Sequence, residues 1–294
     1  MALKQELSIS RQKMTNITAF RKKNLIKMLQ YMILTLFAVL FLYPIIWLFL
    51  NSFKTTQELF ASPWSLPQSL SLDNYVRAFE VGNIGRSFIN SVIISVAVVV
   101  TTTMLAAMAA YGLTRLRWKL SKLVLTLMLL ALMIPAHATV IPLFSMFNTI
   151  HINNTYWAVI IPHVVFTLPI AILIFTGFFT SIPPELEEAA VIDGCSIPRA
   201  FFTIILPISV PALVTVAVIT FIVVWNDLLF PQIFLTDPDM LPLPVGLTNF
   251  KGRYSTDYVG MTAAVVVTII PSIVIYSLLH RRIVSGMTAG ALKG

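Results

Sequence analysis

The sequence predicts an all-α integral membrane protein with six transmembrane helices. Two observations lead to this class. Of the 294 residues, 57% are hydrophobic and only 11% are charged, and the apolar residues gather in runs long enough to cross a bilayer. Soluble domains carry about a quarter charged residues, and a chain of this size cannot hide such an apolar excess in its own core. Much of its surface is therefore expected to face lipid.

A membrane span needs about 20 largely apolar residues. Six runs meet this requirement without any Lys or Arg, namely 29–50, 88–112, 123–147, 156–179, 207–230 and 260–279. Prolines interrupt the last four, at positions Pro135, Pro142, Pro162, Pro169, Pro211 and Pro271. Because a proline removes a backbone donor and bends a helix, we expect bent spans around an interior lined by protein or water.

The loops predict that both termini are cytoplasmic, because Lys and Arg prefer that side of the membrane. With the N-terminus inside, only five of the 20 Lys and Arg lie outside: Lys54, Arg77, Arg86, Lys251 and Arg253. The first apolar run is longer than that of a signal peptide and lacks a cleavage site, which favours a true span over a cleaved leader.

These features predict four segments. Residues 1–28 form a basic cytoplasmic segment, 29–84 the first transmembrane helix and an external loop, 85–282 a core of five transmembrane helices, and 283–294 a cytoplasmic tail. Segment 1–28 allows two interpretations, a helix lying on anionic lipid or a basic anchor for topology. The short apolar face favours the anchor.

The cytoplasmic loop of about 181–207 has the pattern of a helix–turn–helix. Ser181 suits a helix N-cap, and the acidic residues that follow favour the positive end of a helix. Asp193 and Gly194 predict a stop and a turn, with Gly194 free to take a left-handed conformation. Ser196 then suits the cap of a second helix that leads into the fifth span.

The first helix of this loop has an unusual surface. Ala189 and Ala190 lie beside Leu186 among acidic residues, and such a small apolar face with acidic edges suits close packing against another protein. A simple interfacial connector is the alternative.

The spacing in this loop resembles the EAA loop of ABC importer permeases. Glu188, Ala189 and Ala190 are followed by three residues, Gly194, nine residues, and then Ile204, Ile205, Leu206 and Pro207. In that family the first short helix docks into the ATPase subunit. The resemblance therefore implies a coupling role for Glu185, Leu186, Glu188, Ala189, Ala190, Asp193 and Gly194.

Further stretches narrow the resemblance to the smaller six-span permease subunit of the carbohydrate, maltose-type importers. They are Trp225-Asn226-Asp227, the segments 235–238 and 243–247, and the C-terminal residues 286–294. The resemblance implies a bacterial inner-membrane, multi-pass location. It also implies an external loop 231–259 that touches the sugar-binding protein, and a tail that reaches the ATPase through Gly290, Ala291, Leu292, Lys293 and Gly294.

The implied partners are a second homologous permease chain, an ATPase subunit dimer, an extracytoplasmic sugar-binding protein and membrane lipid. The chain has no GxxxxGK[ST] phosphate loop and no catalytic or metal-binding spacing, and Cys195 is its one cysteine. We therefore expect no catalytic residue, no metal and no cofactor bound by this chain, with ATP and magnesium in the partner ATPase. The basic residues lie in short blocks rather than one patch, which argues against nucleic acid.

Polar residues within the spans are candidates for a substrate pathway. His137 and His163 either make structural contacts between helices or line the pathway, and the structural interpretation is favoured. Asp227 and Asn226 either lie at a hydrated helix end or line an outer cavity. Trp225 is either a stacking surface for a sugar ring or an anchor at the membrane interface. Trp225, Asn226, Asp227 and His137 are the pathway candidates.

The predicted function is a permease subunit of an ATP-driven, binding-protein-dependent importer that works by alternating access. A sugar or oligosaccharide is the expected cargo, because the spans hold no Lys or Arg to pair with an anion. The alternatives are the same assembly importing glycerol phosphate or an acidic oligosaccharide, a free-standing channel, an intramembrane enzyme, and a protein scaffold.

Overall fold

The computed structural model describes residues 2–291 except 81, 117 and 251–255, and the side chains of residues 23–279 outside those positions. Every regular element in this part of the chain is helical, which confirms the predicted class. Four helices are long and apolar enough to span a membrane, Lys23–Asn51, Ile84–Thr114, Tyr156–Phe179 and Tyr258–Leu279. Two bent helix pairs raise the number to as many as six if each pair is one span.

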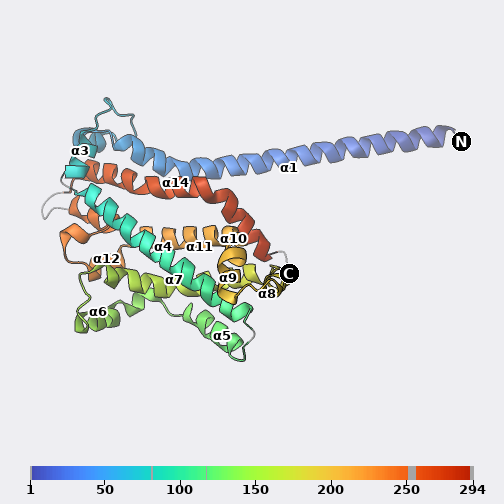
Figure 1. The fold of residues 1–294 in the computed structure, drawn as a ribbon. Coiled ribbons are helices and arrows are strands. Elements are labelled where there is room, and N and C mark those ends of the chain that lie inside the picture. Colours follow the sequence, from blue (N-terminus) through green and yellow to red (C-terminus); the bar gives the residue numbers. More distant parts are fainter. Residues whose placement is uncertain (1, 81, 117, 251–255, 292–294) are drawn as a thin grey trace. The chain divides into compact units, whose positions relative to one another are not determined.

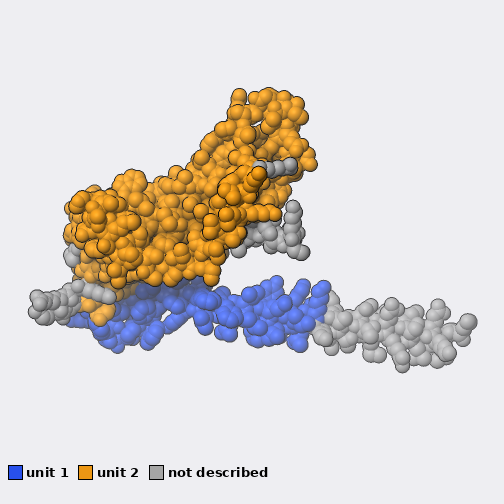
Figure 2. Space-filling view, turned by 90° about the horizontal axis from the view of Figure 1, so that it is seen from below, with its two compact units in different colours: residues 1–71 blue, residues 72–294 orange. Residues whose placement is uncertain are grey.

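The chain divides into two compact units, residues 1–71 and 72–294 (Figure 2). Unit 1 contains α1 (Ala2–Asn51) and α2 (Thr56–Ala61). The helices of unit 2 are α3 (Asp73–Glu80), α4 (Ile84–Thr114), α5 (Ser121–Ala131), η1 (Ala136–Thr139), α6 (Val140–Thr149), α7 (Tyr156–Phe179), α8 (Glu185–Ile192), α9 (Ile197–Ala200), η2 (Phe201–Ile205), α10 (Leu206–Ile208), α11 (Val210–Trp225), α12 (Leu229–Phe234), η3 (Pro238–Met240), α13 (Leu243–Gly246), η4 (Leu247–Phe250) and α14 (Tyr258–Ala291).

In unit 1, the chain after α1 folds back onto the end of that helix. The Nζ atom of Lys54 is buried and donates to the carbonyl oxygens of Ser62 and Pro63 at 3.0 and 3.3 Å. The indole of Trp47 donates to the Pro63 carbonyl oxygen at 3.0 Å, and its ring centroid lies 5.7 Å from that of Trp64. The backbone of α1 runs without a break from the predicted basic segment into the first span.

In unit 2, α4, α7, α11 and α14 pack alongside one another (Figure 1). The pair α4 and α7 approaches closely where α4 presents Ala106, Ala107 and Ala110, all fully buried. Small side chains let two helix backbones come together in a membrane, where dispersion and packing replace the hydrophobic driving force. The residue Ala78 of α3 belongs to a core cluster with Leu243 and Ala263, so α3 is part of unit 2. The sequence-based division instead places α3 in the segment 29–84, together with the first span.

Two predicted spans are not single helices. The third, expected over 123–147, bends by 85° between Ser121–Ala131 and Ala136–Thr149, with Pro135 at the break. The fifth, expected over 207–230, bends by 77° between Ile197–Ile208 and Val210–Trp225 and ends at Trp225. Pro211 lies in the first turn of α11, where its missing N–H costs no hydrogen bond, so it starts a helix rather than kinking one.

Candidate functional site

The loop 181–207 folds as the predicted helix–turn–helix, with α8 first and α9 second. Gly194 has a φ of +79°, which confirms the expected left-handed turn. The turn is closed by hydrogen bonds from the Gly194 and Cys195 amides to the carbonyl oxygens of Val191 and Ala190. The predicted Ser181 cap is wrong, because α8 begins at Glu185 and the Ser181 hydroxyl donates to the Phe178 carbonyl oxygen at 2.6 Å.

The helix α8 turns most of its predicted coupling residues outward. Exposed positions are Glu185, Leu186, Glu188, Ala189, Asp193 and Gly194. Ala190 differs from these residues, since it is only 8% exposed and faces the protein itself, and its coupling role stays a prediction. Two apolar residues that we did not predict, Val191 and Ile192, are 55% and 85% exposed and extend the outward apolar surface.

Glu187 is a second residue that sequence reasoning missed. Its carboxylate points back toward α4, forms an ion pair with Arg115 and accepts a hydrogen bond from Tyr111. In a run of three nearby acidic residues, only the tertiary structure distinguishes the one that faces inward from Glu185 and Glu188.

A second site lies between α7, α11 and η1. Here a cavity of about 620 Å³, which we call the polar cavity, is lined by His137, His163, Thr167, Asn226 and Asp227 together with apolar residues. The aromatic ring of Phe230 lies against both imidazoles, with centroids 6.1 Å from His137 and 5.3 Å from His163. A mostly apolar cavity with a few convergent polar groups is the usual form of a small-molecule site.

His163 and Asp227 form a buried pair within this cavity. The Nδ1 atom of His163 lies 2.7 Å from the Val159 carbonyl oxygen, which only accepts, so Nδ1 carries a hydrogen. Its Nε2 atom lies 3.4 Å from Oδ2 of Asp227, and the side chains are 4% and 11% exposed.

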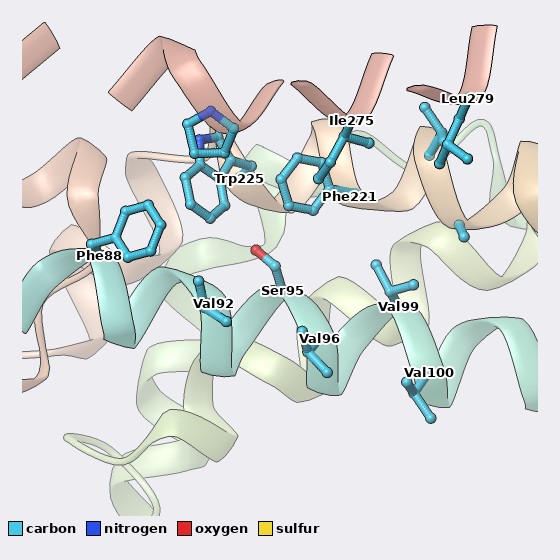
Figure 3. A pocket seen from close by; sticks show the side chains of 13 residues that line it. Phe88, Val92, Ser95, Val96, Val99, Val100, Phe221, Trp225, Ile275 and Leu279 are labelled. Atoms are coloured by element: carbon cyan, nitrogen blue, oxygen red, sulfur yellow. The ribbon is translucent and has the colours of Figure 1, made fainter. Parts of the chain in front are cut away.

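Trp225 lies apart from the other three pathway candidates. Its indole is 2% exposed, donates to the Thr268 carbonyl oxygen at 3.1 Å and packs between Phe88 and Phe221. It lines a different cavity, of about 430 Å³ and almost wholly apolar, that lies between α4, α11 and α14 (Figure 3). The ring is therefore not placed to stack on a solute in the polar cavity, which corrects the predicted role.

Some of the residues predicted to be functional lie outside the part of the chain that the structure describes. The tail residues 292–294 lie outside the described residues, as do 251–255 of the external loop, and Gly290 and Ala291 are described only by their backbone in α14. Among the side chains that the structure describes, no three His, Cys, Asp or Glu gather as ligands for a metal ion.

Apolar spanning helices, a polar cavity between them and an outward-facing helix–turn–helix define a polytopic transport subunit. The sequence model of the family described as "Binding-protein-dependent transport system inner membrane component" matches residues 100–289. The chain belongs to this family and, within it, to the carbohydrate ABC importer permeases of the inner membrane. It is accordingly a transport component and not an enzyme.

Two relatives and one solved structure illustrate the likeness. The diacetylchitobiose uptake system permease protein NgcG of Streptomyces coelicolor is 34% identical over 267 residues, which cover 90% of this chain and 88% of that protein. The trehalose/maltose transport system permease protein MalG of Thermococcus litoralis is 36% identical over 263 residues, with 88% and 94% covered. A bacterial ABC transporter that imports alginate shares the fold, with a TM-score of 0.77, 21% identity, and 89% and 97% covered.

Proposed function

We propose that this chain pairs with a second homologous permease and an ATPase dimer to import a neutral saccharide delivered by an extracytoplasmic binding protein. The outward surface of α8 carries the proposal. A short helix that exposes Leu186, Val191 and Ile192 beside the carboxylates of Glu185 and Glu188 presents an apolar surface that suits a protein partner better than open water. It suits a docking cleft on a partner ATPase subunit. ATP and magnesium would bind to that ATPase rather than to this chain.

The polar cavity supports a neutral cargo. Its described lining holds no Lys or Arg, whereas a phosphate or a uronate needs a cation or several backbone donors. The polar groups there, His137, Asn226 and the His163–Asp227 pair, offer the mixed donors and acceptors that sugar hydroxyls need. Phe166 and Phe230 supply apolar faces of the kind that sugar rings pack against. The names of the two permease relatives above specify diacetylchitobiose, trehalose and maltose, which favours a neutral saccharide as the cargo here.

The assembly is tested by tagging this chain, extracting it gently from its native membrane and identifying what accompanies it by mass spectrometry. We expect a second permease and an ATPase with a Walker motif. The reconstituted complex is then offered labelled trehalose, maltose, glycerol 3-phosphate and an alginate oligosaccharide. Uptake of a disaccharide alone supports the proposal. Recovery of the chain alone from several detergents would refute the assembly, and uptake of only the anionic probes would refute the neutral cargo.

The pathway is tested by Asn226→Ala, because Asn226 is exposed in the polar cavity and its amide donates to the Ile222 carbonyl oxygen of its own helix. Loss of one solute hydrogen bond of about 0.5–1.5 kcal/mol predicts a rise of roughly 2- to 12-fold in the half-saturating disaccharide concentration. Thr126→Ala is the matched control, since Thr126 is also exposed and bonded to a carbonyl of its own helix but lies on α5. Equal uptake curves for both variants would exclude Asn226 from the pathway.

A further inference from the structure

A buried polar cluster joins the first helix of the coupling loop to the end of α4. Arg115 follows α4 directly, and its Nε atom lies 3.1 Å from Oε1 of Glu187 on α8. Its Nη2 atom donates to the carbonyl oxygens of Phe179 and Ile182 at 2.6 and 2.7 Å. The side chains of Arg115 and Glu187 are only 13% and 16% exposed. The guanidinium therefore holds the end of α7, the start of the loop and α8 at one point.

Tyr111 completes this cluster from the last turn of α4. Its hydroxyl donates to Oε2 of Glu187 at 2.9 Å, while Oε1 faces Arg115 in the ion pair without a well-aligned hydrogen bond. Its ring packs against Phe201, with centroids 5.0 Å apart, and against Phe179 at 6.4 Å. Because Glu187 belongs to α8 and Phe201 to η2, which follows α9 directly, one side chain of α4 contacts the segments on both sides of the Gly194 turn.

These contacts are costly to break. Removing one member of a buried charge pair leaves the other without compensation, which is strongly destabilising. The helix α8 has only 8 residues, and an isolated helix of that length is not stable in water. The orientation of α8 therefore depends on its attachments, and the buried cluster is one of the strongest of them.

The far end of α4 is attached as firmly to the external loop. The Nδ2 atom of Asn90 donates to the carbonyl oxygens of Asp239 and Leu241 at 2.8 and 3.1 Å, and the Leu243 amide donates to Ser91 Oγ at 2.8 Å. Between its two ends, α4 runs 31 residues without a proline, about 45 Å. The other long spans each contain proline, at Pro44, Pro162, Pro169 and Pro271.

We propose that Tyr111, Arg115 and Glu187 form a clamp that makes α8 move as one body with α4, so that α4 transmits the motion of the coupling helix to the external loop. The proposal rests on the importer function above, since it assigns positioning residues to that coupling. A proline-free helix transmits displacement along its axis, whereas a proline-broken helix absorbs part of it by bending. Among the described spans, α4 therefore suits this role best.

The clamp is tested by measuring the distance between spin labels on α8 and α4 in the purified importer complex. One label is placed on the native Cys195, which closes the turn directly after α8 and lies outside its outward apolar surface, and the other on Met108→Cys, which is exposed on α4. With the clamp intact, we expect one narrow distance distribution that is the same without nucleotide and with ATP plus vanadate. In Glu187→Ala, we expect a broader distance distribution that shifts between the two nucleotide states. We also expect about tenfold less disaccharide uptake per ATP hydrolysed, which corresponds to a loss of about 1.4 kcal/mol of coupling free energy.

Two further variants separate tethering from folding. Tyr111→Phe keeps the ring against Phe201 and removes only the hydroxyl that reaches Glu187, so we expect an intermediate broadening with normal assembly. Arg115→Ala is expected to broaden the distribution as Glu187→Ala does, and Arg199→Ala, which removes an exposed arginine of α9, is expected to leave it unchanged. Unchanged distances and unchanged uptake per ATP in Glu187→Ala and Tyr111→Phe would overturn the clamp. A wild-type preparation without ATP hydrolysis would instead refute the importer assembly.

Discussion

Gly194→Val is expected to leave membrane insertion intact and to abolish ATP-driven uptake. Gly194 sits at φ +79°, and a Cβ added there would meet no atom within 4 Å. The damage therefore comes from the backbone alone. A left-handed conformation costs an ordinary L-residue about 1–2 kcal/mol, and a β-branched residue tolerates it least. The turn is expected to relax toward negative φ and to rotate α8 away from its docking orientation.

The matched control is Gly194→Asn. Asparagine also adds a side chain at this open position, but it tolerates the left-handed region. We therefore expect Gly194→Asn to retain most of the uptake and Gly194→Val to retain almost none, with equal amounts of both variants in the membrane fraction. Normal uptake by Gly194→Val would show that the angle between α8 and α9 does not matter for coupling.

Breaking the His163–Asp227 pair is expected to lower the thermal stability of the purified protein. Either His163→Leu or Asp227→Leu leaves the remaining group buried without its partner, a cost of about 1–3 kcal/mol. Changing both residues to Leu removes both members of the pair, and the only further loss is the Asp227 acceptor of the Phe230 amide, which Asp227→Leu already removes. We therefore expect the double variant to lose less stability than the two single variants added together.

The measurement is a double-mutant cycle of denaturation midpoints in one detergent at one pH. Ser145→Leu serves as the control, because Ser145 lies on α6 outside the polar cavity. The loss of stability caused by Ser145→Leu is expected to add to that of either single variant without any coupling energy. Strict additivity of His163→Leu and Asp227→Leu would mean that the two side chains do not interact across their 3.4 Å separation.

Much of the candidate site could be predicted from local sequence. The position of Gly194 was predictable because a turn after a helix needs a residue that accepts positive φ, and this need is local. The outward direction of Glu185, Leu186 and Glu188 followed from a family pattern in a cytoplasmic loop. The inward direction of Glu187 and Ala190 could not be predicted, because the sequence alone does not distinguish neighbouring residues of a short acidic helix until their tertiary contacts are known. Tyr111 lies 76 positions away from Glu187 in the chain.

Several membrane crossings and the helix–turn–helix at 181–207 could be predicted from the residues, because they depend on apolar length, charge placement and local turn chemistry. The role of a transport subunit was predicted from the resemblance of the 181–207 spacing to a known family. The bends of 85° and 77° in two spans, the separation of Trp225 from Asp227 and the pairing of Asp227 with His163 became known only from the structure. Those outcomes depend on contacts between helices, and side chains on adjacent positions of one helix can face different neighbours.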